Sequence, residues 1–357
     1  MAEEFVNANL ILPGTYIRVR SEGLIGVAGI STGNIGVVGT AAQGLGATHE
    51  ISPAAEAVAT FGDPDAVTTR ARNLTRIVGE LLRSGARTVY ARAVAVGAPP
   101  ADYSTAFEEV VKENVQILVA PELSTANALT VLGPFLENGE NNGQDLIAVV
   151  GADGDDADEV VDQAITNDRI ILCAPGYFVS NPADPDTDVA LPGNYTAAPV
   201  AGLLSTLSPH SSPTNKTLPA LGRLSQRFSY GERIDLVQNR IFVLEQRNGV
   251  RVVRGLTTDD GGFRQVTTRR IVDFAKAGIR QVGNAFVGRL NNERVRAALK
   301  GAIDGFLTGM LVDEQLTNYN LEVTATRRDE IEGRAIVNVL LQPTFSIDFV
   351  AVTLVLQ

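Results

Sequence analysis

The chain has 357 residues, 45% of them hydrophobic and 20% charged, which is typical of a soluble globular protein with room for two or three domains. Its 41 acidic and 30 basic residues give a formal net charge of -11, which argues against nucleic acid as a partner because binding a phosphate backbone needs clustered cations. No apolar run approaches the roughly 18 residues of a membrane span, and Glu3 and Glu4 stand where a signal peptide would carry cations, so we expect cytoplasmic synthesis and no membrane partner.

The N-terminal residues are predicted to form an extended arm. Residues 9–19 (NLILPGTYIRV) are apolar and β-prone, are interrupted by Pro13 and Gly14, and come before any globular pattern has begun. Such a stretch needs a partner to cover it. Its candidate contact residues are Leu10, Ile11, Leu12, Tyr16, Ile17 and Val19.

Two stretches that alternate strands and helices follow the arm. The first has glycine-punctuated strands within residues 24–39, helices at 54–61 and 69–84, and a strand at 88–96. The second is predicted to place strands at residues 115–120, 146–150 and 170–174, with helices at 125–137 and 156–166 between them. Alternation of this kind is typical of an α/β fold with a mostly parallel sheet.

The second half of the chain begins irregularly and then becomes regular. Residues 177–219 are rich in Pro, Ser, Asn and Asp and are predicted to form long connections. A hairpin is expected at residues 240–255, with its turn at Asn248 and Gly249. The elements expected after it are helices at residues 268–289 and 293–311, the second capped by Asn291 or Asn292, and strands at 320–325 and 334–341.

Basic side chains gather on these two helices. The predicted outward stripe of the first helix carries Arg269, Asp273, Lys276, Arg280 and Asn284, with Arg270 adding to its positive charge. The second helix places Arg294, Arg296 and Lys300 outside. In an acidic chain, a local cationic region of this kind favours contact with an acidic protein surface. Ordinary solvated helix faces are the alternative interpretation.

The chain ends in an apolar strand. Residues 346–357 (SIDFVAVTLVLQ) place apolar side chains on both faces, the pattern of a strand that is covered on both sides. Burying roughly eight such side chains is worth on the order of 10 kcal/mol, so the strand needs a partner. The candidate contact residues are Ile347, Phe349, Val350, Val352, Leu354 and Leu356. Two apolar ends predict a polymer whose subunits exchange strands.

The sequence offers little reactive chemistry. His49 and His210 are the two histidines, and neither has the closely spaced Cys or His partners of a zinc site. His210 lies among serines, but no Gly-x-Ser-x-Gly turn accompanies it, so a hydrolase triad is not indicated. Cys173 lies in an apolar run and is interpreted as a buried small residue. We therefore expect no catalytic residue, cofactor or metal.

A nucleotide site is the stronger enzymatic alternative. Residues 151–159 (GADGDDADE) place Gly151 and Gly154 between a strand and a helix, where a phosphate-binding turn would lie. However, Asp153, Asp155 and Asp156 already supply anions at that helix end, so a phosphate would meet like charge. Acidic capping of the helix is the favoured interpretation.

Several segments, in chain order, carry a family resemblance. They are PGTYIRV (residues 13–19), residues 30–39, residues 60–62, LLRSGARTVYARAV (residues 81–94), AAPVAGLLS (residues 197–205) and nearly all of residues 270–357. Together they resemble the contractile tail sheath family, which includes the sheaths of contractile phage tails, R-type bacteriocins and related injection systems. The order of these segments over most of the chain is more specific than any one of them.

The resemblance implies a mixed α+β and α/β fold. Its implied parts are an N-terminal linker arm (residues 1–22), outer α/β domains (23–100 and 101–205), a C-terminal sheath domain (206–342) and a C-terminal strand arm (343–357). In the family, exchanged N- and C-terminal strands of neighbouring subunits complete the compact C-terminal α+β domain, which links six-subunit rings into a helical mesh. The outer domains then slide when the sheath contracts.

The resemblance also implies partners and a location. The C-terminal domain of the family lies innermost and touches the tail tube through a helix, here residues 293–304, which makes Arg294, Arg296 and Lys300 tube-facing candidates. The implied partners are other copies of the chain, the inner tail tube protein, and baseplate and tail terminator proteins. The expected location is a virion tail or an extracellular or cytoplasmic contractile particle, made in the bacterial cytoplasm. Two alternatives stay open: a nucleotide-binding α/β enzyme with swapped strands, and a non-contractile ring or baseplate component.

Overall fold

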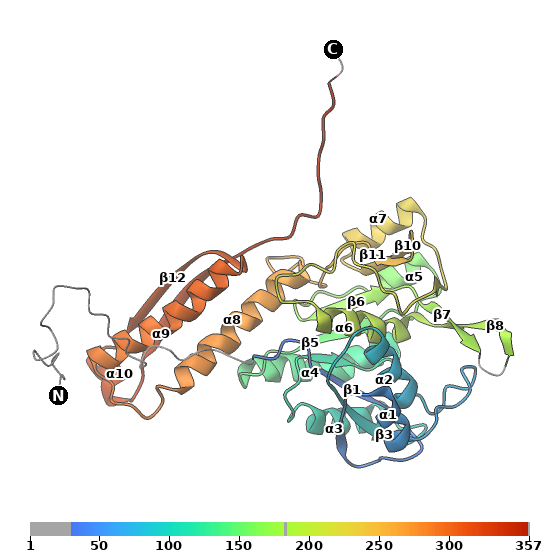
Figure 1. Ribbon diagram of the computed structural model, residues 1–357, viewed down its shortest axis with the longest axis horizontal. Coiled ribbons are helices and arrows are strands. Elements are labelled where there is room, and N and C mark those ends of the chain that lie inside the picture. The colour runs from blue at the N-terminus through green and yellow to red at the C-terminus, as the bar shows by residue number, and fades with distance from the viewer. Residues whose placement is uncertain (1–29, 182–183, 356–357) are drawn as a thin grey trace, which may run out of the picture.

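The computed structural model describes residues 30–181 and 184–355, which form a body, a smaller C-terminal unit and an extended C-terminal segment (Figure 1). The body contains an eight-stranded sheet in the order β11-β10-β6-β5-β4-β1-β3-β2. Its strands are β1 (Ile35–Thr40), β2 (Thr48–Ile51), β3 (Val89–Val94), β4 (Ile117–Val119), β5 (Ile147–Gly151), β6 (Ile170–Ala174), β10 (Phe242–Gln246) and β11 (Val250–Val252). The edge strands β2 and β11 are antiparallel to their neighbours, and the strands between them are parallel, which confirms the expected mostly parallel sheet.

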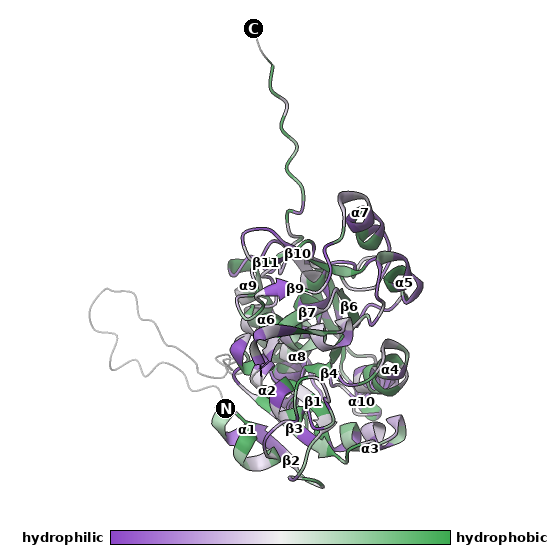
Figure 2. Ribbon diagram, turned by 90° about the vertical axis from the view of Figure 1, so that its right-hand side faces the viewer, coloured by the Kyte–Doolittle hydropathy of each residue, from purple (hydrophilic) through white to green (hydrophobic). Residues whose placement is uncertain are grey.

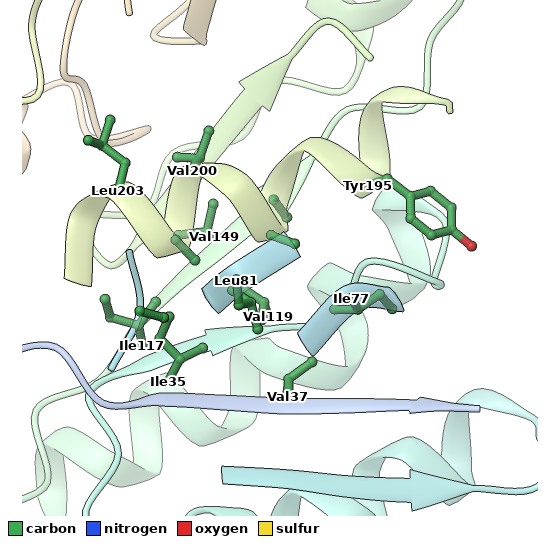
Figure 3. Close-up of a cluster of buried hydrophobic side chains, with 14 of the residues drawn as sticks. Ile35, Val37, Ile77, Leu81, Ile117, Val119, Val149, Tyr195, Val200 and Leu203 are labelled. Carbon is green, nitrogen blue, oxygen red and sulfur yellow. The ribbon is translucent and has the colours of Figure 1, made fainter. Parts of the chain in front are cut away.

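Helices cover both faces of this sheet because its central strands are apolar throughout. Every residue of β1, β5 and β6 is buried, the pattern of strands enclosed on both sides. One face packs against α1 (Ala54–Phe61), α2 (Leu74–Arg83) and α6 (Ala197–Thr206). The other face packs against α3 (Pro100–Val110), α4 (Thr125–Asn141), α5 (Ala157–Asp162) and α7 (Tyr230–Gln238). Figure 3 shows the first of these two cores, where side chains of α2 and α6 lie over β1, β4 and β5.

The sheet continues across the boundaries expected at residues 100 and 205. β1 lies between β3, from the first expected outer domain, and β4, from the second. At the other end of the sheet, β10 and β11 come from the expected C-terminal domain but extend the same sheet beside β6. The order of strands along the sequence does not reveal which strands are neighbours. The sequence pattern therefore did not show that strands from all three expected domains share one sheet.

The prediction of long irregular connections at residues 177–219 was wrong for much of that range. It contains β7 (Tyr177–Asn181), β8 (Asp184–Leu191), a 3-10 turn at Gly193–Thr196, and α6, while β9 (Arg223–Leu224) completes a small sheet in the order β8-β7-β9. Residues 197–204 of α6 are all buried, so the helix lacks the one-sided apolar stripe by which helices are recognised. The hairpin β10–β11 is confirmed, with Asn248 and Gly249 at the positive φ angles, 52° and 97°, that its tight turn needs.

The C-terminal unit packs two helices against a two-stranded sheet. α8 (Val266–Asn284) leads out of the body to α9 (Glu293–Val312), and β12 (Leu316–Thr324), α10 (Arg327–Ile331) and β13 (Ile336–Pro343) follow (Figure 1). Of the two expected caps, Asn292 begins α9, since its side chain accepts a hydrogen bond from the backbone N–H of Val295 at 3.0 Å. The two helices and two strands expected here are confirmed, with shifted ends. Residues 344–355 form no strand in the structure, although a strand was predicted from residue 346.

The close crossing of α8 and α9 depends on Gly278, because a Cβ atom there would lie 2.0 Å from Cζ of Phe306. We predict that Gly278→Ala lowers the free energy of unfolding by about 1–3 kcal/mol through overpacking. Gly283→Ala on the same helix is the matched control, because its Cβ would meet nothing within 4 Å, and it should raise stability by up to about 1 kcal/mol. Urea unfolding of the full chain measures both variants, and a stabilised Gly278→Ala protein would contradict the close crossing.

Candidate functional site

The sheet of the C-terminal unit has a covered face and an open face. The covered face packs on α8 and α9 and carries the cross-strand pairs Tyr319–Leu341, Leu321–Val339 and Val323–Val337. The open face carries the pairs Asn318–Gln342, Asn320–Leu340, Glu322–Asn338 and Thr324–Ile336. On this face Leu340 is 73% exposed and Ile336 is 40% exposed. A small apolar surface is therefore left in solvent on the outside of a two-stranded sheet.

Both edges of the same sheet are open. β12 and β13 pair with each other, and no other strand within residues 30–181 and 184–355 pairs with either of them. A sheet of two strands is marginal on its own, and an open edge can accept a further strand through main-chain hydrogen bonds. The C-terminal unit thus has a position for one added strand at each side.

The C-terminal segment is an extended apolar stretch that pairs with no strand in the described part of the chain. It extends away from the rest of the molecule and is hydrophobic along much of its length (Figure 2). Its large apolar side chains lie in solvent: Ile347 is 82% exposed, Phe349 78%, Val350 81%, Val352 73%, Leu354 85% and Val355 78%. Monomeric proteins rarely expose contiguous apolar surface, so this segment is a candidate contact with another chain.

The remaining arm candidates lie outside the described residues. These are Leu10, Ile11, Leu12, Tyr16, Ile17 and Val19 of the N-terminal arm, and Leu356 of the C-terminal arm. The role of all the arm residues in linking subunits stays a prediction.

The three tube-facing candidates on α9 differ in their surroundings. Arg294 and Lys300 are exposed, and no hydrogen bond or ion pair joins either of them to another residue in the described part of the chain. Arg296 instead donates to Glu330 of α10 and to Asn291 Oδ1, both at 3.0 Å, and its side chain is 16% exposed. The part of α9 between residues 297 and 312 exposes mainly small residues, including Gly301, Gly305 and Gly309. Arg294 and Lys300 are therefore the cations that α9 presents to solvent.

The predicted outward stripe of α8 is wrong except at Asn284, which is exposed, because the rest of that face packs against acidic residues of the body. Arg269 is 3% exposed and donates to Asp168 at 2.7 Å and to Asp273 at 2.6 Å. Lys276 and Arg280 both pair with Asp145, at 2.6 and 3.2 Å. The body adds Arg169, which is 3% exposed and pairs with Asp145, Asp273 and Glu140. Hydrogen bonds from Arg169 and Lys276 lower the pKa of Glu140 to about 2.

Arg270 lies in the same contact region, and its hydrogen bonds go to backbone carbonyl groups. Its Nη2 donates to the carbonyl oxygens of Thr32 and Leu207, at 3.1 and 2.9 Å. Burial lowers the pKa of its guanidinium to about 10. The alternating charges of α8 were visible in the sequence and favoured an exposed helix, but the sequence did not show that an acidic surface covers them. α8 is joined to the body mainly by charged groups.

The crevice where sheets of this kind bind ligands is filled by the protein itself. β1 lies between β3 and β4, so the strand order reverses at β1. The crevice at the C-terminal end of β1 is therefore the place where sheets of this kind usually bind ligands. Glu122 occupies that position and accepts hydrogen bonds from Thr40 N at 3.0 Å, Thr40 Oγ1 at 3.0 Å and Tyr103 Oη at 2.7 Å. Burial raises the pKa of Glu122 to about 7, although these hydrogen bonds act in the opposite direction.

The glycine turn at residues 151–159 is also occupied from within. Asp156 caps α5 by accepting from Glu159 N at 2.9 Å, which confirms the acidic cap. Asp153 accepts from Thr125 Oγ1 at 2.7 Å, and a Cβ at Gly151 would lie 2.0 Å from the carbonyl oxygen of Gly193. Neither position leaves room for a phosphate. Within the described residues, no group of three or more His, Cys, Asp or Glu side chains is placed to hold a metal ion.

Comparison with protein families identifies the two parts of the chain. Residues 97–258 match the phage tail sheath protein central domain, and residues 258–357 match the phage tail sheath C-terminal domain. The search of curated proteins found no match. The class is therefore that of structural sheath proteins.

Solved structures have the same fold at low sequence identity. The helical sheath of the anti-feeding prophage in its contracted state superimposes with a TM-score of 0.76 at 16% identity, covering 96% of this chain and 99% of that one. The contracted sheath complex of the PVC extracellular contractile injection system gives 0.72 at 17%, covering 96% and 97%. A sheath tail protein from Desulfitobacterium hafniense gives 0.67 at 14%, covering 93% and 100%.

The chain belongs to the contractile tail sheath family, because the two family matches together span residues 97–357. This confirms the resemblance and the mixed α and β fold expected from it. Among the described helices, none is long and apolar enough to cross a membrane.

The buried carboxylate at the ligand crevice has a testable pH signature. Because its folded-state pKa is raised from 4.5 to about 7, the folded state binds more protons than the unfolded state between these values, and stability falls as pH rises through this window. The loss should be on the order of 3 kcal/mol. We predict that Glu122→Gln removes most of this pH dependence.

Urea unfolding of the full chain between pH 4.5 and 8 measures the effect. Glu108→Gln, an exposed position on α3, is the matched control and should follow the wild-type curve. A Glu122→Gln protein whose stability declines with pH as steeply as the wild type would show that Glu122 is not the titrating group.

Proposed function

We propose that this protein is the repeating subunit of a contractile sheath, assembled as stacked rings of six around an inner tube. The observation that carries the proposal is the presence in one chain of an uncovered apolar segment and an incomplete sheet. The segment contains the exposed Val350, Val352 and Leu354, and the sheet is the β12–β13 pair with two open edges. In the described part of the chain, the segment lacks a sheet to pair with, and the sheet lacks strands at its two edges.

Exchange between copies satisfies both. The C-terminal strand of one subunit pairs with one edge of a neighbour's β12–β13 sheet, and the N-terminal arm of another subunit, residues 10–19, takes the second edge. Covering a Val or Leu side chain contributes about 1.5–3 kcal/mol, and added main-chain hydrogen bonds satisfy the strand edges. Every subunit both gives and receives strands, so the assembly continues rather than closing on a dimer.

The division of the chain follows from this. The arms are residues 1–22 and 343–357, the β12–β13 unit with α8 and α9 is the linked inner part, and the body is the outer part. When subunits rotate and the lattice shortens, the bodies change neighbours while the arms hold the inner sheets together. A few kcal/mol released per subunit, summed over a long polymer, supplies the work that drives the tube through an envelope.

In this arrangement α9 contacts the tube. Arg294 and Lys300 are the exposed cations of that helix, and Arg296, the third candidate, is held partly by Glu330. Exposed ion pairs contribute about 0–1 kcal/mol each, which sets the register on an acidic tube but lets the contact break when the sheath contracts.

The partners proposed are further copies of the chain, the inner tube protein, and the baseplate and terminator proteins at the two ends of the sheath. An anti-feeding prophage baseplate structure is among those with the same fold, at a TM-score of 0.76 and 16% identity. The protein acts in a virion tail or a related contractile particle made in the bacterial cytoplasm. It needs no catalytic residue, because packing between subunits provides the work.

Removing the apolar character of the C-terminal strand should abolish polymers without unfolding the subunit. We predict that Val352→Asp and Leu354→Asp, singly or together, leave the free energy of unfolding within about 0.5 kcal/mol because both residues are exposed. The same variants, and deletion of residues 350–357, should yield no tubes by negative-stain electron microscopy. Val96→Asp, at an exposed position of the body, is the control. Long tubes formed by the deletion protein would refute the arm assignment, and closed rings from the wild type would favour a ring component.

Reversing the exposed charges of α9 should separate tube docking from sheath formation. We predict that Arg294→Glu with Lys300→Glu reduces assembly on purified tubes several-fold, because an acidic tube surface then meets like charge. Tube-free sheath should form as in the wild type. Arg87→Glu, at an exposed position of the body, is the control for a charge reversal away from α9. Equal loss of both kinds of assembly, counted by electron microscopy, would exclude tube docking by these residues.

A further inference from the structure

The C-terminal segment has two parts with different surroundings. Residues 344–349, here called the root, contact the protein's own body and C-terminal unit. Residues 350–355, here called the tip, make no hydrogen bond, ion pair or ring contact with any other residue in the described part of the chain. The sequence changes at the same place, since Ser346 and Asp348 share one side of the extended chain with Val350, Val352 and Leu354.

Backbone groups of the root are held by two glutamines. The N–H of Thr344 donates to the carbonyl oxygen of Gln315 at 3.0 Å, which extends the sheet contact of β13 by one step. Gln265, directly before α8, binds both groups of Ser346: its Oε1 accepts from Ser346 N at 3.0 Å, and its Nε2 donates to Ser346 O at 3.2 Å. The side-chain amide of Gln265 thus makes the two hydrogen bonds to the backbone of Ser346 that a neighbouring strand would make.

Asp348 is the charged centre of the root. Its Oδ2 accepts from Arg254 Nε at 2.7 Å and from Gln265 Nε2 at 3.2 Å, and its Oδ1 accepts from Thr214 Oγ1 at 3.3 Å. The carboxylate side chain is 6% exposed and that of Arg254 is 17% exposed, so the pair is largely shielded from water. The guanidinium of Arg254 also lies 5.1 Å from the ring centre of Phe349. Three separate parts of the body converge on one aspartate.

We propose that Asp348, with Gln265 and Arg254, anchors the C-terminal arm to its own subunit, so that the arm crosses to a second copy of the chain only from Val350 onward. This inference rests on the strand exchange proposed above and adds where the exchanged strand begins. The eight residues from Val350 to Gln357 reach roughly 26 Å when extended at about 3.3 Å per residue.

Anchoring the root affects how readily the tip is captured. A tip that leaves a fixed point in a fixed direction loses less conformational freedom on pairing than one that swings from residue 343. It is also presented to the neighbour at a higher effective concentration. Asp348 is therefore a positioning residue, which acts on assembly without touching the neighbouring subunit.

The test compares Asp348→Asn and Arg254→Gln with Asp260→Asn, an exposed loop position that makes the same charge change as the first. We expect the subunit concentration needed for tube formation to rise at least about tenfold in the first two variants, equivalent to 1.4 kcal/mol, and not in the control. The double variant Asp348→Lys with Arg254→Glu restores an ion pair and should recover part of the loss. Recovery would show that the ion pair itself, and not either residue alone, sets the subunit concentration needed for tube formation.

Hydrogen–deuterium exchange of the full chain gives the second readout. In free wild-type subunits the amides of Thr344 and Ser346 should be protected and those of residues 350–355 should not, and Asp348→Asn should weaken protection at Ser346. In tubes the tip should gain protection while the root keeps it. Loss of root protection on assembly, or tube formation by Asp348→Asn at the wild-type concentration, overturns the anchor.

The two proposals fail in different ways. If the tip gains no protection in tubes, or tubes form without residues 350–357, strand exchange itself is wrong and the anchor is wrong with it. If the tip is protected and the anchor variants assemble normally, exchange stands and only the anchor is rejected.

Discussion

An apolar strand is stable in water only when other groups cover its faces and pair with its backbone, and this chain carries an extended apolar segment that has neither within the described residues. Val350, Val352 and Leu354 are all at least 73% exposed. The same chain carries β12 and β13, which form a sheet whose open face exposes Leu340 and whose edges have no further strand in the described part of the structure. Neither feature is favourable in a monomer, because each leaves hydrogen-bonding groups or apolar groups without a partner. In the proposed assembly they are the two halves of one contact between copies of the chain.

α8 connects this contact to the rest of the molecule. It packs on α9 at Gly278, and it meets the acidic side of the body through Arg269, Lys276 and Arg280. Both ends of the described chain are held near the start of this helix: Arg270 binds the carbonyl oxygen of Thr32, and Gln265 binds Ser346. Since buried charges are costly to separate, the charged contact favours one orientation of α8 on the body. Thr32 and Ser346 are thereby both held at the start of one helix.

Local patterns in the sequence predicted most elements but not their neighbours. The strands from residue 117 to residue 174, the Asn248–Gly249 hairpin and the two C-terminal helices follow from periodicity and turn chemistry, which act over a few residues. The continuous sheet could not be read in this way, because its strand order is set by packing of distant segments. α6 was missed because it is buried on every side. The polar stripe of α8 was recognised, but its burial depended on Asp145 and Asp168, more than a hundred residues away in the chain.

The candidate site was predicted in part for a related reason. Exposed apolar residues at a chain end signal a missing partner whatever the fold, so the C-terminal segment was proposed as a contact without knowledge of the body, and the strand predicted there is not formed in the structure. The division of this segment at Val350 was not predicted, although Ser346 and Asp348 interrupt the apolar pattern. A polar residue such as Asp348 can either face solvent or bind another part of the protein. Its hydrogen bonds with Arg254, Thr214 and Gln265, which only the structure shows, decide for the second. A free apolar edge also invites pairing with wrong partners. In the proposed assembly, a root bound to its own subunit restricts where the tip can go, and the exposed segment then favours ordered assembly over aggregation.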